Sequence, residues 1–198
     1  MGLSFVYLPG QTPLDESEAE GLRIPGIQTH AELDEFEQQN IEEAMLWSLR
    51  RSFRPAEVFS EAFIRRVHQQ MFGNVWNWAG EFRQSEKNLG INRWQIPGAL
   101  KCLLDDALYW QQMQVYSPDE AALRFKHRLV SIHCFCNGNG RHSRLLADII
   151  TSKLRGQPVF SWGRGNLARQ GLARSAYLHA LRAADAGDIV PLLRFARS

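Results

Sequence analysis

Residues 133–144 read His133-Cys134-Phe135-Cys136-Asn137-Gly138-Asn139-Gly140-Arg141-His142-Ser143-Arg144. A strong helix start precedes this stretch: Ser117 is a good N-cap, and Glu120 follows it three residues later. Apolar residues at helical spacing carry the predicted helix to His133, namely Ala122, Phe125, Leu129 and Ile132. Two glycines then allow a sharp turn, and a new helix is predicted over about 140–155. The stretch therefore predicts a tight loop between two helices.

The side chains of this loop predict a particular chemistry. The unperturbed pKa of a histidine is near 6.5, so His133 could take a proton from an attacking hydroxyl at neutral pH. The glycine-rich turn and the start of the next helix offer backbone N–H groups to an anion. Arg141 and Arg144 are three residues apart, so both point to one side, where guanidinium groups suit phosphate oxygens. A base, an anion site and two arginines together predict phosphoryl or nucleotidyl transfer.

A zinc site is the alternative interpretation of the same loop. Cys134, Cys136, His133 and His142 lie close in sequence, but the second Cys/His pair of the usual spacing is absent. We therefore expect the two cysteines to be half-buried packing residues, and His142 to lie at the surface near the site.

Helical periodicity dominates the rest of the 198 residues and predicts a mostly α, single-domain protein with about seven helices. Helices are expected over about 29–51 (with Leu33, Phe36, Ile41, Ala44, Met45 and Leu49 inward), 60–73, 97–113, 118–133, 140–155 and 167–186, with a short one after Asp188. A left-handed Gly73 is expected to end the second. Residues 74–96 are aromatic-rich, with short apolar stretches broken by asparagine and glycine, and predict a small β-hairpin. Residues 1–28 predict an irregular arm with at most one helical turn near 14–20.

Composition excludes several classes of protein. Hydrophobic residues make up 44% and charged residues 22%, which is typical of globular domains. A net charge of +2 makes nucleic acid an improbable partner, and no apolar run is long enough to span a membrane. The three cysteines are odd in number, and the first residues lack a signal-peptide pattern. We therefore expect a cytoplasmic protein.

The loop sequence closely resembles the signature of the Fic/Doc family, His-x-Phe-x-(Asp/Glu)-Gly-Asn-Gly-Arg-x-x-Arg, at every position except Asn137. The stretch Trp78-Ala79-Gly80-Glu81-Phe82-Arg83 resembles the family's conserved segment before its flap hairpin. Pro13-Leu14-Asp15 and Asn137 look most like the subgroup called mobile mystery protein B. The resemblance divides the chain into an arm with an inhibitory segment (1–28) and a Fic-like catalytic domain (29–198).

The resemblance implies a protein adenylyltransferase, which binds ATP with Mg²⁺ (or Mn²⁺) and transfers AMP to a Ser, Thr or Tyr hydroxyl of a target protein. Carried over by position, His133 is the general base and Phe135 anchors the loop. Gly138, Asn139 and Gly140 form the anion hole. Arg141 contacts the β- and γ-phosphates, and Arg144 supports the phosphates or the loop. A flap that includes Asn88, Leu89, Gly90 and Ile91 would clamp the target by strand pairing.

Asn137 stands where the family has an acid, so metal binding is expected to be weaker. Glu20 and Gly21 resemble the end of the family's inhibitory motif, which predicts a pair between Glu20 and Arg144. Two alternatives stay open. One is a weak or inactive nucleotide-binding Fic module that acts with a co-encoded, antitoxin-like partner. The other is a Doc-like phosphotransferase, although Gly138-Asn139-Gly140 favours AMP transfer.

Overall fold

A computed structural model of the chain describes residues 12–27, 29–164, 167 and 171–198. The first eleven residues and residue 28 of the predicted arm lie outside the described residues. So do residues 165–166 and 168–170, the last three of which belong to the start of the helix predicted from about 167.

The mostly α fold is confirmed, and nine α-helices occur in the described part of the chain. They are α1 (Glu16–Ala19), α2 (His30–Leu49), α3 (Pro55–Val58), α4 (Glu61–Phe72), α5 (Ile96–Met113), α6 (Pro118–Ile132), α7 (Asn139–Ile149), α8 (Leu172–Asp185) and α9 (Val190–Arg197). A π-helical turn, Ile150–Leu154, extends α7, and 3-10 turns span Arg93–Gln95 and Trp162–Arg164. The two helices beyond the predicted seven are α1 and α3, which are single turns.

Side-chain caps fix where the main helices begin. Thr29 and Glu32 form a capping box at the start of α2, while Ser60 and Ser117 accept hydrogen bonds from the third residue of α4 and α6. The end of α4 differs from the prediction, because Gly73 is right-handed with φ −68°. Glycine is favoured there for space: a Cβ atom would lie 2.6 Å from the carbonyl oxygen of Gln69.

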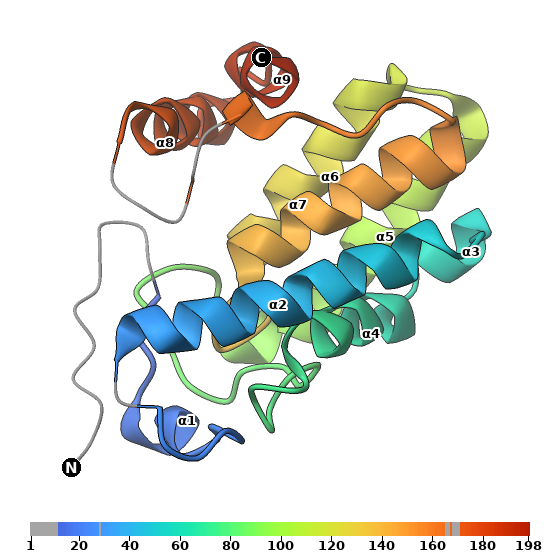
Figure 1. Cartoon of the computed structure of the whole chain (residues 1–198). Helices are drawn as coiled ribbons and strands as arrows, with labels where there is room; N and C mark the ends of the chain where they lie inside the picture. Colours follow the sequence, from blue (N-terminus) through green and yellow to red (C-terminus); the bar gives the residue numbers. More distant parts are fainter. Residues whose placement is uncertain (1–11, 28, 165–166, 168–170) are drawn as a thin grey trace.

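The helices pack in pairs around one core (Figure 1). Helix α2 lies along α4, α6 packs against α5 and α7, and α8 pairs with α9. Phe125, Phe135, Ile64, Met71 and Leu103 are among the largest fully buried side chains of this core. Among the described residues, no helix has both the length and the apolar character that a membrane crossing requires.

The inward face of α2 is more polar than predicted. Leu33, Ile41 and Ala44 are buried as expected, but Phe36, Met45 and Leu49 are exposed. The buried face instead includes Glu37, Asn40 and Ser48. Asn40 donates to the carbonyl of Gln70 and accepts from the backbone of Asn74, so its buried amide has partners on α4 and on the turn that follows it.

The predicted β-hairpin is not formed: the described residues contain no strand, and residues 81–92 are a loop, termed here the flap loop. An isolated antiparallel bridge joins Leu22 and Trp76. The buried guanidinium of Arg83 donates to the carbonyls of Ser85 and Ile91 within the loop. The two arms of the loop are therefore joined through the Arg83 side chain and not by a ladder of backbone hydrogen bonds.

Candidate active site

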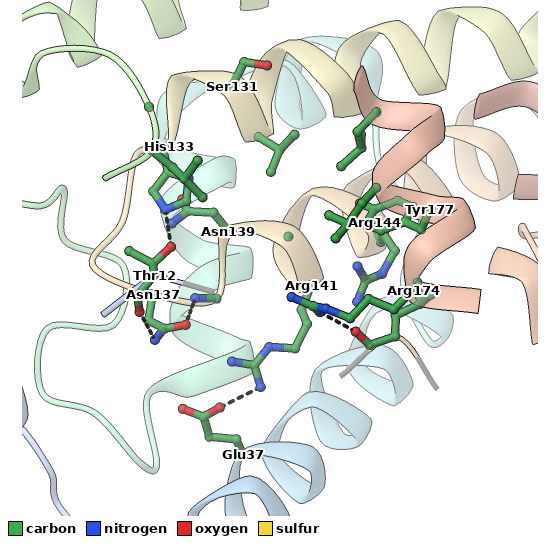
Figure 2. Close-up of a pocket in the computed structure, with 18 of the residues that line it drawn as sticks. Thr12, Glu37, Ser131, His133, Asn137, Asn139, Arg141, Arg144, Arg174 and Tyr177 are labelled. Atoms are coloured by element: carbon green, nitrogen blue, oxygen red, sulfur yellow. Dashed lines mark hydrogen bonds and ion pairs between the residues drawn. The ribbon is translucent and has the colours of Figure 1, made fainter. Parts of the chain in front are cut away.

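A cavity of about 640 Å³ opens where α6, α7 and the flap loop meet. Its walls come from distant parts of the chain (Figure 2). The residues that line it include Thr12, Glu37, Gly90, His133, Asn137, Gly138, Asn139, Gly140, Arg141, Arg144, Arg174 and Tyr177. The volume is in the range of small-ligand sites. The structure thus brings together the predicted base, glycine turn and two arginines in one cavity.

His133 lies at the C-terminal end of α6 in the left-handed region, with φ 59°. Gly90 of the flap loop packs directly on it, and a Cβ atom at Gly90 would overlap the His133 Cβ atom. Burial, with the positive charge of Arg83, lowers the pKa of His133 to about 4. The imidazole is therefore neutral at physiological pH and can accept a proton.

The hydrogen bonds of His133 leave Nε2 as that acceptor. The backbone carbonyl of Val130 bonds to the imidazole, and Nε2 lies 2.8 Å from the hydroxyl oxygen of Thr12. A carbonyl can only accept, so we assign the ring proton to Nδ1. Nε2 then takes a hydrogen bond from the Thr12 hydroxyl, which is the contact a general base makes with an attacking alcohol.

The loop from 135 to 139 is held rigidly in the core. The Asn139 side chain accepts from the Phe135 backbone N–H at 3.0 Å and donates to its carbonyl at 2.8 Å. Phe135 is fully buried and stacks on His68 with ring centroids 3.8 Å apart. Asn139 therefore closes the loop with its side chain, and only its backbone is left for an anion. The predicted anchoring by Phe135 is confirmed.

His68 of α4 is a part of the site that sequence reasoning missed. Its Nδ1 accepts from the Gly80 N–H, so Nε2 carries the proton and donates to the carbonyl of Asn137 at 3.0 Å. Burial holds the pKa of His68 well below its ordinary value, which keeps this tautomer neutral. The sequence gives no signal for it, because a single histidine on an apolar helix face has many uses.

The N-terminus of α7 faces the cavity and suits an anion. Gly138 is left-handed, with φ 76°, and a Cβ atom there would come within 2.5 Å of the Phe72 ring. The first turn of α7 has neither an acidic residue nor a side-chain cap. Its N–H groups and helix dipole therefore present positive charge to the cavity beside Gly140 and Arg141.

A carboxylate of this chain forms an ion pair with Arg141, the first of the two arginines. Glu37 Oε2 lies 2.6 Å from Arg141 Nη1, and Glu37 Oε1 accepts from the Trp76 indole at 2.6 Å (Figure 2). Arg144 lies over the Tyr177 ring, 5.6 Å from its centroid. Burial alone would raise the pKa of Tyr177, but the charges of Lys126 and Arg144 lower it. Glu37 was missed, although a charge at helical spacing between Leu33 and Ile41 was a readable signal.

Two predictions about single residues are wrong. Glu20 is exposed at the end of α1 and forms no ion pair with Arg144 in the described part of the chain. The acid that reaches a motif arginine is Glu37, and the buried acid of α1 is Glu18. His142 is buried, not at the surface, because it points back from α7 to the carbonyl of Ile64, 3.0 Å away.

The flap loop lies beside His133, and Arg83 connects it to the loop between α6 and α7, residues 133–138, termed here the motif loop. The Arg83 guanidinium donates to the His133 carbonyl at 2.7 Å, and its backbone N–H donates to the Cys134 carbonyl at 2.9 Å. Leu89 and Gly90 line the cavity, while Asn88 and Ile91 flank them in the loop. Of the predicted docking residues, Leu89 and Gly90 therefore share the cavity with the base, although they form no strand.

The residues of the motif loop do not make a metal site. Asn137 Oδ1 accepts from the Gly138 N–H at 2.6 Å, and its amide nitrogen donates to the Thr12 carbonyl at 3.3 Å. Glu37, a carboxylate that lines the cavity, is paired with Arg141. Within the described residues no group of three His, Cys, Asp or Glu side chains is placed to hold a metal ion. The cysteines are free, and burial raises the pKa of Cys134 and Cys136 to about 12.

Comparison with known proteins gives this geometry a context. Residues 58–151 match the model of the Fic/DOC family. Over 136 residues, 67% of the chain, it is 33% identical to "Protein adenylyltransferase Fic" of Drosophila grimshawi and 32% identical to the protein of the same name from Aedes aegypti. The chain spans about a quarter (26%) of the length of these curated relatives.

Solved structures share the fold over most of the chain. Fic-1 of C. elegans (residues 134–508) has a TM-score of 0.64 at 25% identity, over 90% of this chain and 51% of that one. BepC of Bartonella tribocorum, with bound AMPPNP, has a TM-score of 0.69 at 17% identity, over 92% of this chain and 97% of that one. At that lower identity the likeness establishes the fold alone.

Proposed function

Residues 58–151 of this chain form a Fic/DOC family domain, and from this premise we propose that the chain is a protein adenylyltransferase. It would transfer AMP from ATP to a Ser, Thr or Tyr hydroxyl of a target protein. The observation that carries the proposal is the contact between a hydroxyl oxygen and His133 Nε2, 2.8 Å apart, in a cavity that also holds Arg141 and the start of α7. The name of the 32–33% identical relatives supports the same activity.

The geometry supports a separate role for each residue of the site in the proposed transfer. A target hydroxyl placed at Nε2 gives its proton to neutral His133 as its oxygen attacks the α-phosphorus. Pyrophosphate leaves, and its charge is balanced by Arg141 and the N–H groups of the first turn of α7. Arg144 and Arg174 extend the positive lining of the cavity. Arg83 acts as a positioning residue, because it fixes the backbone of His133 and of the flap loop.

Finer parts of the proposal rest on the sequence. Mg²⁺ or Mn²⁺ would be held by the phosphate oxygens of ATP, since Asn137 supplies only a neutral amide that is already bonded. We propose membership of the mobile mystery protein B subgroup, a cytoplasmic location, a catalytic domain over 29–198 and docking of the target on the flap loop. An antitoxin-like partner belongs to the same proposal.

Asn137 also favours a second candidate, a module that binds nucleotide and transfers nothing. The test uses ATP labelled at the α- or the γ-phosphate, added with Mg²⁺ or Mn²⁺ to a bacterial lysate. The purified wild-type chain should pass α-label to protein, and His133→Ala should not. Transfer of γ-label would instead indicate Doc-like phosphorylation. ATP binding without transfer of either label would overturn the adenylyltransferase in favour of the binding module.

A further inference from the structure

The hydroxyl that contacts the base belongs to the chain itself. Thr12 is buried, 7% exposed, and its Oγ1 reaches His133 Nε2 from the arm, 121 positions earlier in the sequence (Figure 2). The Thr12 carbonyl accepts from the Asn137 side chain, and the next carbonyl, that of Pro13, accepts from Lys87 of the flap loop at 3.0 Å. Two successive carbonyls are thus held by the motif loop and the flap loop, with the hydroxyl pointing at the base.

Helix α1 locks this segment in place. Glu18 is buried and accepts from Ser85 Oγ at 2.6 Å, and it forms a close ion pair with Lys87. The backbone carbonyl of Glu18 also accepts from the Trp78 indole at 2.9 Å. Residues 12–18 therefore dock on the flap loop, where a target segment is expected to dock. The arm therefore lies where the target segment and its hydroxyl are proposed to lie.

Resting on the proposed function, we infer that Thr12 is itself an acceptor, and that the domain transfers AMP in cis to the Thr12 hydroxyl. Thr12 Oγ1 forms a bond to the α-phosphorus of ATP. The bond from that phosphorus to the oxygen bridging the α- and β-phosphates breaks, and its electron pair leaves with pyrophosphate. The hydroxyl proton passes to His133 Nε2. The product carries one AMP per chain, as a phosphodiester on Thr12.

The test incubates the full chain with ATP and Mg²⁺ and locates AMP by intact-mass and peptide mass spectrometry. Wild type and Thr12→Ser should gain one AMP at position 12. Thr12→Val, which keeps the shape but lacks the hydroxyl, and His133→Ala should gain none there. Ser17→Ala is the matched control, because Ser17 is an exposed residue of the same segment whose hydroxyl donates to Asp15. Equal thermal midpoints show that each variant is folded.

Two further arms make the inference falsifiable. In cis, the first-order rate stays constant when the chain is diluted a hundredfold, and Thr12→Val does not label Thr12 of His133→Ala; labelling between chains would overturn the reaction in cis. AMP on lysate proteins with none on Thr12 would overturn this inference and leave the proposed function standing. AMP on neither, with ATP bound, would overturn both.

Discussion

Replacing Glu37 with glutamine should tighten nucleotide binding, because it removes a negative charge from the arginine expected to meet the phosphates. In the structure the carboxylate lies 2.6 Å from Arg141 Nη1, inside the cavity wall. A phosphate must displace this carboxylate to reach the same guanidinium. Glutamine keeps an oxygen for the Trp76 indole, so the substitution changes charge and leaves the second hydrogen bond of the site in place.

The size of the effect follows from how exposed the pair is. A hydrogen bond between charged groups contributes about 1.5–3 kcal/mol. The Arg141 side chain is 29% exposed and that of Glu37 is 7% exposed, so solvent screens the pair in part and the lower end applies. A gain of about 1.4–2 kcal/mol corresponds to a Kd lower by roughly 10- to 30-fold. The gain should shrink in high salt, since the Debye length falls as the salt concentration rises.

The assay is calorimetric titration with a non-hydrolysable ATP analogue, which separates binding from transfer. Glu35→Gln is the matched control, because Glu35 is an exposed acid of the same helix, and it should leave Kd unchanged. In an Arg141→Ala background Glu37→Gln should lose most of its gain. An unchanged or weaker affinity of folded Glu37→Gln, or a full gain without Arg141, would refute the reasoning.

Three further predictions concern the frame of the site. His142 has a pKa of about 3 in the folded chain and about 6.5 when unfolded, so the unfolded state gains the proton first and stability falls below pH 6.5. At pH 5 this removes about 2 kcal/mol relative to pH 8, and urea unfolding of His142→Gln should show a correspondingly smaller acid loss; an identical loss would contradict it. Phe135→Ala should lower the free energy of unfolding by about 3–5 kcal/mol, measured in urea, whereas a loss under 1 kcal/mol would contradict its packing on His68. Arg83→Lys should slow AMP transfer in the labelling assay while ATP binding persists, because a compact ammonium cannot span the three carbonyls that Nε, Nη1 and Nη2 of the planar guanidinium reach; unaltered transfer would refute its positioning role.

Local signals carried most of what could be predicted. The hydroxyl caps at Thr29, Ser60 and Ser117 fix helix starts through bonds to residues three positions away, which a sequence displays directly. The glycines of the motif loop likewise act on their own backbone. The predicted base, turn and arginines share one cavity because all of them lie in one tight loop or in the first two turns of the helix that follows it.

Distant partners explain what was missed. The predicted hairpin assumed that the backbone of residues 81–92 pairs with itself, but Arg83 takes two of its carbonyls. The inward face of α2 was misjudged because Glu37 is stabilised there by partners 39 and 104 positions away. Helical spacing places Glu37 on the inward face, but it cannot show which distant partners make its burial favourable. Thr12 had no local signal for the same reason.

Two contacts from outside the matched region occupy the functional groups within it. Thr12 bonds to His133, Glu37 pairs with Arg141, and both lie N-terminal to residues 58–151. A target hydroxyl can reach Nε2 only when Thr12 has left. The apparent affinity for the target therefore equals the intrinsic affinity multiplied by the fraction of chains in which the arm is open. Loss of the Thr12 hydroxyl removes one bond that holds the arm closed. It follows that Thr12→Val should label lysate proteins faster than wild type, even as its own label at position 12 disappears.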